Sequence, residues 1–165
     1  MTQVTDSNEQ DVELALEDFM NSGGTLAMLK GISRDELEQM YSLAHSYYQS
    51  GKFQEAETIF KGLTALNHYD ERFLLGLGAC RQALKQYEMA IHSYAYGALV
   101  AIEDPRFPFH AAECHVELGD WAAAESGFYS AHALAEARTD QTELGARAGL
   151  MLEYIESQKR SEQCQ

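Results

Sequence analysis

The sequence predicts an all-α protein, and three observations support this. Apolar residues make up 45% of the 165 positions, enough to build a core in a chain of this length. Only two prolines are present, so long helices can run with few interruptions. Small and aromatic residues also recur at one fixed interval along the chain, which is typical of a helical repeat.

The interval is 34 residues, and it relates three consecutive stretches of the chain. Residues 51–53, 85–87 and 119–121 are equivalent by this step. The same step relates Ala56, Ala90 and Ala124, the aromatic residues Phe60, Tyr94 and Phe128, and the pairs 43–44, 77–78 and 111–112. This pattern is typical of tetratricopeptide repeats, where small residues lie at the crossing of two helices and an aromatic ring fills the space beside them. The sequence therefore predicts three tandem helix–turn–helix units at about 37–70, 71–104 and 105–138, wound into a right-handed superhelix.

The segment before the repeats, residues 9–32, is predicted to be helical, after a flexible stretch over residues 1–8. It carries one apolar stripe at helical spacing, formed by Val12, Ala15, Leu16, Phe19 and Met20. Gly23 and Gly24 should end this helix, and Thr25 can cap a short helical segment from Leu26 to Lys30.

The starts of two repeat helices carry capping signals. The repeat region as a whole is predicted to span residues 33–138. Ser33 and Glu36 have the spacing of a capping box, which should begin the first helix of its first unit. Asp104 followed by Pro105 supplies an N-cap residue and a proline at the first helical position, which should begin the third unit. Gly51 and Gly119 should turn the chain between the two helices of a unit.

A last helix is predicted within residues 139–160, followed by a flexible tail over 161–165. Its apolar stripe consists of Leu144, Ala148, Met151, Leu152 and Ile155. An array of three repeats leaves one apolar end open, and this helix is suited to cover it.

The charge balance restricts the possible partners. Twelve Lys and Arg residues stand against 26 Asp and Glu residues, so the formal net charge is −14. This argues against binding of nucleic acid or of an anionic membrane, because phosphates would be repelled. The chain begins without a basic segment followed by an apolar one, and its cysteines are sparse and odd in number (Cys80, Cys114 and Cys164). We therefore expect a cytoplasmic protein with reduced thiols.

The phase of the repeat helices predicts a concave binding groove. Positions five, nine and twelve of each first helix should face it, namely Tyr41, His45, Tyr48, Leu75, Ala79, Gln82, Phe109, Glu113 and Val116. Aromatic rings with polar tips suit an extended peptide with proline or aliphatic anchors. The alternative is that some of these side chains pack against the flanking helices instead.

No reaction chemistry is predicted. His110, Cys114 and His115 lie close together, but no second ligand segment such as a Cys-x-x-Cys pair accompanies them. Residues 76–78 (Gly-Leu-Gly) belong to a helix column rather than to a nucleotide-binding turn. We therefore expect no metal, no cofactor and no enzymatic activity.

Three stretches resemble one family closely. GGTLAMLKGIS (23–33), LNHYDERFLLGLGACRQ (66–82) and DPRFPFHAAECH (104–115) are similar to the class II type III secretion chaperones, the low-calcium-response H family. The resemblance implies a bacterial cytosolic chaperone that binds two hydrophobic translocator proteins and prevents their premature aggregation or membrane association. It also implies that an extended client segment lies in the groove against Tyr41, Tyr48, Phe53, Leu66 and His68. Where the family usually has an aromatic residue, this chain has His45, which makes the pocket more polar.

The resemblance further implies a homodimer in the absence of client, built in part through the N-terminal helix. In this chain that helix offers Leu16, Phe19 and Met20. The alternative function is a tetratricopeptide adaptor, a regulatory scaffold in the control of secretion genes that does not protect a client.

Overall fold

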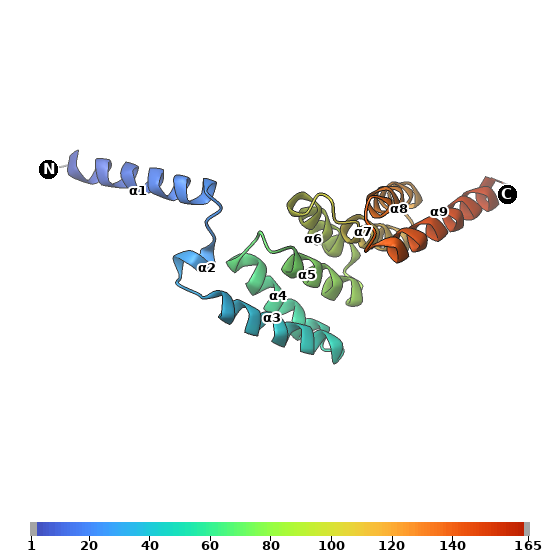
Figure 1. Cartoon of the computed structure of the whole chain (residues 1–165), viewed down its shortest axis with the longest axis horizontal. Helices are drawn as coiled ribbons and strands as arrows, with labels where there is room; N and C mark the ends of the chain where they lie inside the picture. The colour runs from blue at the N-terminus through green and yellow to red at the C-terminus, as the bar shows by residue number, and fades with distance from the viewer. Residues whose placement is uncertain (1–2, 164–165) are drawn as a thin grey trace.

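The computed structural model describes residues 3–163, and the side chains of residues 12–160. This described part contains α-helices and no strand, which confirms the all-α prediction. The helices follow one another with short connections (Figure 1). Their bounds are α1 Gln3–Asn21, α2 Leu26–Leu29, α3 Arg34–Gln49, α4 Phe53–Leu66, α5 Glu71–Ala83, α6 Tyr87–Val100, α7 Arg106–Glu117, α8 Trp121–Glu136 and α9 Thr142–Gln163.

Helices α3 to α9 form one continuous array in which each helix packs on the next. The small and aromatic columns of the 34-residue period are its core, as predicted. Their fully or almost fully buried members are Ala56, Ala90 and Ala124, with Phe60, Tyr94 and Phe128. The array is therefore held together by the same contact repeated in each unit, which is the packing of tandem tetratricopeptide repeats.

The small residues of the period are needed because the helices approach closely. A Cβ atom on Gly78 would lie 2.3 Å from the ring of Tyr94. A Cβ on Gly76 would lie equally close to the ring of Phe60, and one on Gly97 would meet Phe107. Each aromatic ring thus rests directly on the backbone of a neighbouring helix, so a side chain at these positions would push the helices apart.

The turns within the units share one backbone conformation. Gly51 and Gly119 have φ angles of +74° and +75°, as expected for glycines that turn the chain. Lys85 occupies the equivalent place in the second unit and has φ of +60°. A left-handed conformation is costly for a residue with a Cβ, so the turn geometry is imposed here by the packing of α5 against α6.

The predicted capping residues of α2, α3 and α7 all make capping contacts, although α7 begins one residue later than predicted. Ser33 and Glu36 form the predicted capping box, since each backbone N–H donates to the other's side chain at 3.2 and 2.8 Å. Thr25 caps α2 as predicted, by accepting from the N–H of Met28. Helix α7 begins at Arg106, one residue later than expected, with Asp104 accepting from the Arg106 N–H.

Helix α9 continues the repeat instead of merely covering its end. Cys80, Cys114 and Ala148 are related by the 34-residue step, and all three are fully buried. Ala148 and Ile155 pack in one cluster with Phe128 of α8. Helix α9 is therefore the first helix of a fourth unit, and it runs to Gln163, beyond the predicted start of the tail at residue 161.

Helix α1 projects away from the array (Figure 1). It begins at Gln3, although the sequence predicted a flexible stretch up to residue 8. Of its predicted stripe, Leu16 and Met20 remain 48% and 42% exposed. The ring of Phe19 lies against Gly24, where a Cβ would come within 2.3 Å of it. The linker after α1 is thus held by Phe19, while the rest of the stripe faces solvent.

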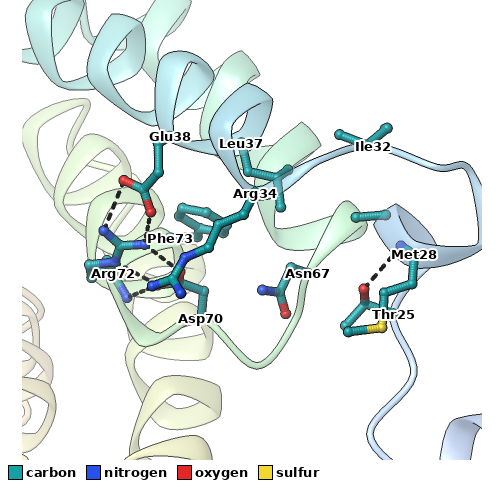
Figure 2. Close-up of a pocket in the computed structure, with 11 residues that line it drawn as sticks. Thr25, Met28, Ile32, Arg34, Leu37, Glu38, Asn67, Asp70, Arg72 and Phe73 are labelled. Atoms are coloured by element: carbon teal, nitrogen blue, oxygen red, sulfur yellow. Dashed lines mark hydrogen bonds and ion pairs between the residues drawn. The ribbon is translucent and has the colours of Figure 1, made fainter.

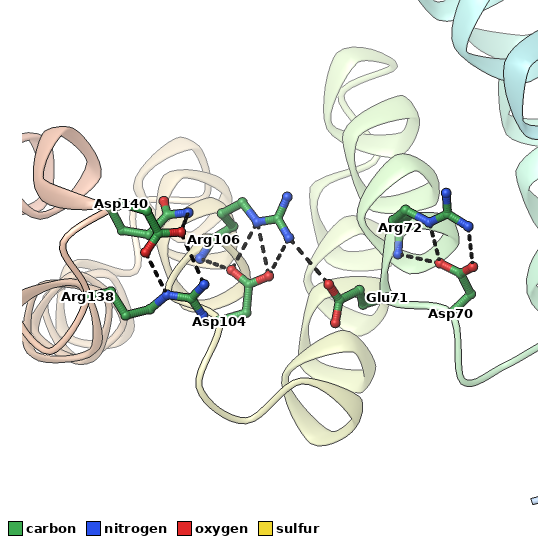
Figure 3. A network of polar contacts seen from close by, with 8 residues as sticks. Asp70, Glu71, Arg72, Asp104, Arg106, Arg138 and Asp140 are labelled. Carbon is green, nitrogen blue, oxygen red and sulfur yellow. Dashed lines mark hydrogen bonds and ion pairs between the residues drawn. The ribbon is translucent and has the colours of Figure 1, made fainter.

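Charged pairs connect successive units at the same step. Arg72 pairs with Glu38, Arg147 with Glu113 and Lys159 with Glu125, and each pair joins residues 34 apart. A second series lies at the junctions between units (Figure 3). It consists of Asp70 with Arg72, Asp104 with Arg106 and, with the charges exchanged, Arg138 with Asp140.

Candidate peptide-binding groove

A pocket of about 200 Å³ lies between α3 and α5, and its lining is mostly aromatic and aliphatic. We call it the apolar pocket. The structure brings five of the predicted groove residues together here: Tyr41, His45, Tyr48, Leu75 and Ala79. Phe60, Gly76, Arg72 and Arg106 complete the lining. Helix phase alone therefore placed these five side chains on one surface.

Tyr41 is held in place from several sides. Its ring lies 6.0 Å from that of Phe60 and 5.9 Å from that of Phe73, measured between centroids. The guanidinium of Arg72 lies over the Tyr41 ring at 5.0 Å. A ring fixed in this way loses little conformational freedom when a ligand covers it.

Arg72 is itself fixed by two carboxylates (Figure 2). It pairs with Asp70 at 2.7 Å and with Glu38 at 2.6 Å. Hydrogen bonds to Asp70 and Glu38 raise the pKa of Arg72 further above its ordinary value, so the group stays charged. Arg72 also borders a second cavity of about 330 Å³, which lies beside α2 and is lined on one side by Thr25 and Met28 (Figure 2).

Tyr48 lines the apolar pocket and also a second pocket beside it. Its ring meets that of Phe53 edge-on, with centroids 5.3 Å apart. Burial raises the pKa of the Tyr48 hydroxyl, which therefore remains a hydrogen-bond donor at neutral pH. Phe53, which the family resemblance placed in the groove, lines neither of these two pockets and reaches the site only through its contact with Tyr48.

A further pocket of about 390 Å³ continues the surface toward α7 and α9. It shares Tyr48 and Ala79 with the apolar pocket, and its other lining residues are Gln82, Ala83, Tyr94, His110, Glu113 and Arg147. We call it the polar pocket, and the two together the groove. Because they share a wall, one extended segment can lie across both.

Glu113 organises the polar pocket. His110 Nδ1 lies 2.8 Å from its carboxylate, the Gln82 amide donates to it at 3.1 Å, and Arg147 approaches to 3.4 Å. Burial alone would raise the pKa of Glu113, but the hydrogen bonds from His110 and Gln82 outweigh it and lower the pKa. The carboxylate is therefore ionised at neutral pH and is satisfied by groups of the chain itself.

The other predicted residues lie in different places. Phe109 is only 1% exposed, and its ring packs edge-on against Phe128 beneath the guanidinium of Arg147. Leu66 packs against the core at the end of α4. His68 stacks on Tyr69 in the following loop, with ring centroids 4.0 Å apart. None of these three side chains lines the apolar pocket or the polar pocket.

The groove also contains residues that the sequence interpretation did not select. Tyr94 and His110 were assigned to the repeat core and to a rejected metal cluster, yet both line the polar pocket. Arg147 was not selected because α9 was interpreted only as a cover. The period itself contained the missing signal, because His45, Ala79, Glu113 and Arg147 are successive members of one 34-residue column.

The described residues offer no other type of site. No group of three His, Cys, Asp or Glu side chains among them is arranged to hold a metal ion. Cys80 and Cys114 are free thiols in the core, and burial raises the pKa of each to about 12. None of the helices in this part of the chain is long and apolar enough to cross a membrane.

Comparison with known proteins identifies the family. The model of the tetratricopeptide repeat family matches residues 37–70. The low calcium response locus protein H of Yersinia pestis is 53% identical over 156 residues, covering 94% of this chain and 93% of that protein. The chain belongs to the low-calcium-response H family.

Solved structures of this family include complexes with peptides. PcrH bound to the chaperone-binding region of PopD is 58% identical, with a TM-score of 0.77 over 78% of this chain and 97% of that one. The Yersinia enterocolitica type III secretion chaperone SycD, bound to a peptide of the translocator YopD, is 55% identical, with a TM-score of 0.74 over 78% and 98% of the two chains. SycD thus binds a segment of a translocator, and PcrH binds the chaperone-binding region of PopD.

Proposed function

We propose that this chain is a chaperone of type III secretion translocators that holds an extended client segment in the groove. The observation that carries the proposal is the continuous surface from α3 to α9, with the fixed rings of Tyr41 and Tyr48 at its apolar end. The complexes of PcrH and SycD with translocator segments, on the same fold, support it.

The apolar pocket suits an aliphatic or proline side chain of the client. Burying one such side chain contributes about 1.5–3 kcal/mol. Tyr41 and Tyr48 offer large contact areas at low entropic cost, and their hydroxyl groups can donate to carbonyl groups of an extended backbone. His45 is exposed at the edge of this pocket and adds a polar contact. Binding alone accounts for this function, and no catalytic step is needed.

The role of the complex follows from the surfaces of the two partners. A translocator must enter a membrane, so its apolar segments would aggregate or insert early if they were free. The net charge of −14 makes the chaperone exterior repel other acidic surfaces and anionic membranes. We propose that it acts in the bacterial cytoplasm, on two hydrophobic translocators before their export.

Helix α1 is the proposed dimer element of the client-free protein. Leu16 and Met20 lie one helical turn apart and are both exposed. An exposed apolar stripe on a helix that stands clear of the array suits pairing with a second copy (Figure 1). Phe19 contributes by fixing the linker at Gly24.

Calorimetric titration with the chaperone-binding region of PopD tests the groove. The double variant Tyr41→Ala, Tyr48→Ala should bind about 100-fold more weakly, since each ring contributes roughly 1–2 kcal/mol. Tyr129→Ala is the matched control, because Tyr129 is 67% exposed on α8 and does not line the groove. Equal affinities of the double variant and the wild type, with helical content unchanged, would contradict the proposal.

A further inference from the structure

The groove changes its chemistry along its length. At the α3 and α5 end the lining is aromatic and aliphatic, with Tyr41, Tyr48 and Leu75. At the α7 and α9 end the lining is more polar, and it includes His110, Glu113 and Arg147. A segment lying across both pockets therefore meets two different environments, and the second one can select among clients that satisfy the first.

We propose that the polar pocket is a subsite for a carboxylate of the client segment, recognised by Arg147. The proposal rests on the proposed function, and it adds a specificity-determining residue to it. The client it describes is an extended segment that places an aliphatic or proline side chain in the apolar pocket and an Asp or Glu side chain in the polar pocket.

Arg147 is positioned to receive such a ligand. Its guanidinium lies 4.7 Å above the ring of Phe109, which is itself locked against Phe128. Among residues 12–160, whose side chains the structure describes, its one ion pair is the contact of 3.4 Å with Glu113, and the side chain is 53% exposed. A guanidinium has five N–H donors in a planar fork, so most of these donors are free for a carboxylate that enters the pocket.

The two main acceptors of the polar pocket, in contrast, already have partners within the chain. The Glu113 carboxylate faces His110, Gln82 and Arg147. The Gln82 carbonyl oxygen accepts from the Tyr94 hydroxyl at 2.8 Å. A Lys or Arg of the client would compete with these donors for the same oxygens, whereas an Asp or Glu uses donors of Arg147 that have no strong partner.

The three arginines that line the groove differ in how far their charges are neutralised. Arg72 is paired with Glu38 and Asp70, and Arg106 with Glu71 and Asp104. Arg147, in contrast, is paired among the described residues with Glu113 alone, at 3.4 Å. The chain as a whole has a net charge of −14. An acidic side chain is thus disfavoured over the protein's surface in general, and Arg147 is the place in the groove where it meets the least neutralised cation, which helps to fix the register of the bound segment.

The test uses fluorescently labelled peptides of the PopD chaperone-binding region, in which single positions are replaced in turn by Asp, Asn or Lys. Anisotropy titrations give the affinity of each peptide for the wild type and for Arg147→Gln. We expect one position at which the wild type prefers Asp over Lys by about tenfold, the scale of a partly desolvated charge pair. Arg147→Gln should reduce this ratio to about twofold or less, and Arg147→Lys should retain part of it.

Arg160→Gln is the matched control, because it removes the same charge from the same helix at a side chain 78% exposed and paired with Glu156. It should leave the Asp-to-Lys ratio unchanged. The subsite is overturned if no position prefers Asp, or if Arg147→Gln and the wild type show the same ratio. In either case, continued loss of binding in the Tyr41→Ala, Tyr48→Ala variant would leave the proposed function standing. Failure of the wild type to bind the unmodified PopD region would overturn both.

Discussion

Replacing Gly78 with alanine tests the close packing on which the whole array depends. Gly78 lies in α5, and an added Cβ would stand 2.3 Å from the ring of Tyr94. Tyr94 is 1% exposed, and its hydroxyl donates to Gln82, so the ring has little room to move. Gly62 in α4 is the matched control, because a Cβ there meets nothing within 4 Å.

The expected changes in the free energy of unfolding have opposite signs in the two variants. Alanine in place of glycine within a helix stabilises by about 0.8–1 kcal/mol, and Gly62→Ala should show this gain. Gly78→Ala has the same gain, but it forces out the Tyr94 ring at a cost of about 1–3 kcal/mol and weakens the Gln82 hydrogen bond by about 1 kcal/mol. We therefore expect Gly78→Ala to be about 1–3 kcal/mol less stable than the wild type.

Thermal and urea unfolding followed by circular dichroism measure the difference. In a chain of this size, 1 kcal/mol corresponds to about 2–4 °C in Tm. Gly62→Ala should melt about 2–4 °C above the wild type, and Gly78→Ala below it by a similar or larger amount. If Gly78→Ala were as stable as Gly62→Ala, the ring would not rest on the backbone of α5, and the explanation of the small-residue column would be refuted.

Two further predictions concern charge and self-association. Burial alone would raise the pKa of Glu57, but its pairing with Lys61 and Arg81 lowers this pKa in the folded protein. The ionised Glu57 carboxylate therefore stabilises the fold above about pH 4.3, the pKa of a glutamate in the unfolded chain, and this contribution is lost as the pH falls below that value. Urea unfolding between pH 6 and about pH 3 should therefore show a smaller loss of stability in Glu57→Gln than in the wild type, and equal losses would contradict this role. For the dimer, Leu16→Glu with Met20→Glu should shift the client-free protein toward the monomer in sedimentation velocity, whereas Leu14→Glu, on another side of α1 and also exposed, should not. A doubly substituted protein that sediments as the wild type does would remove this stripe from the interface.

Much of the fold follows from short-range patterns in the sequence. The capping box at Ser33, the turn glycines and the buried small and aromatic columns depend on residues close in sequence or one period apart, and all of them appear in the structure. The same helix phase placed Tyr41, His45, Tyr48, Leu75 and Ala79 around one pocket. A repeat makes such inference possible because each unit meets its neighbour through the same contacts.

The tertiary structure decided what depends on the docking of particular helices. Whether Phe109 lines the groove or lies beneath it is determined by α9, which places Arg147 over its ring. Likewise, the polar character of the far pocket arises where α5, α7 and α9 bring Gln82, His110 and Arg147 around one carboxylate. Helical periodicity determines which side of a helix is apolar, but it does not contain the distances between side chains of different helices. The sequence alone therefore determined the repeat and the aromatic end of the groove, and only the packed array decided where the groove becomes polar.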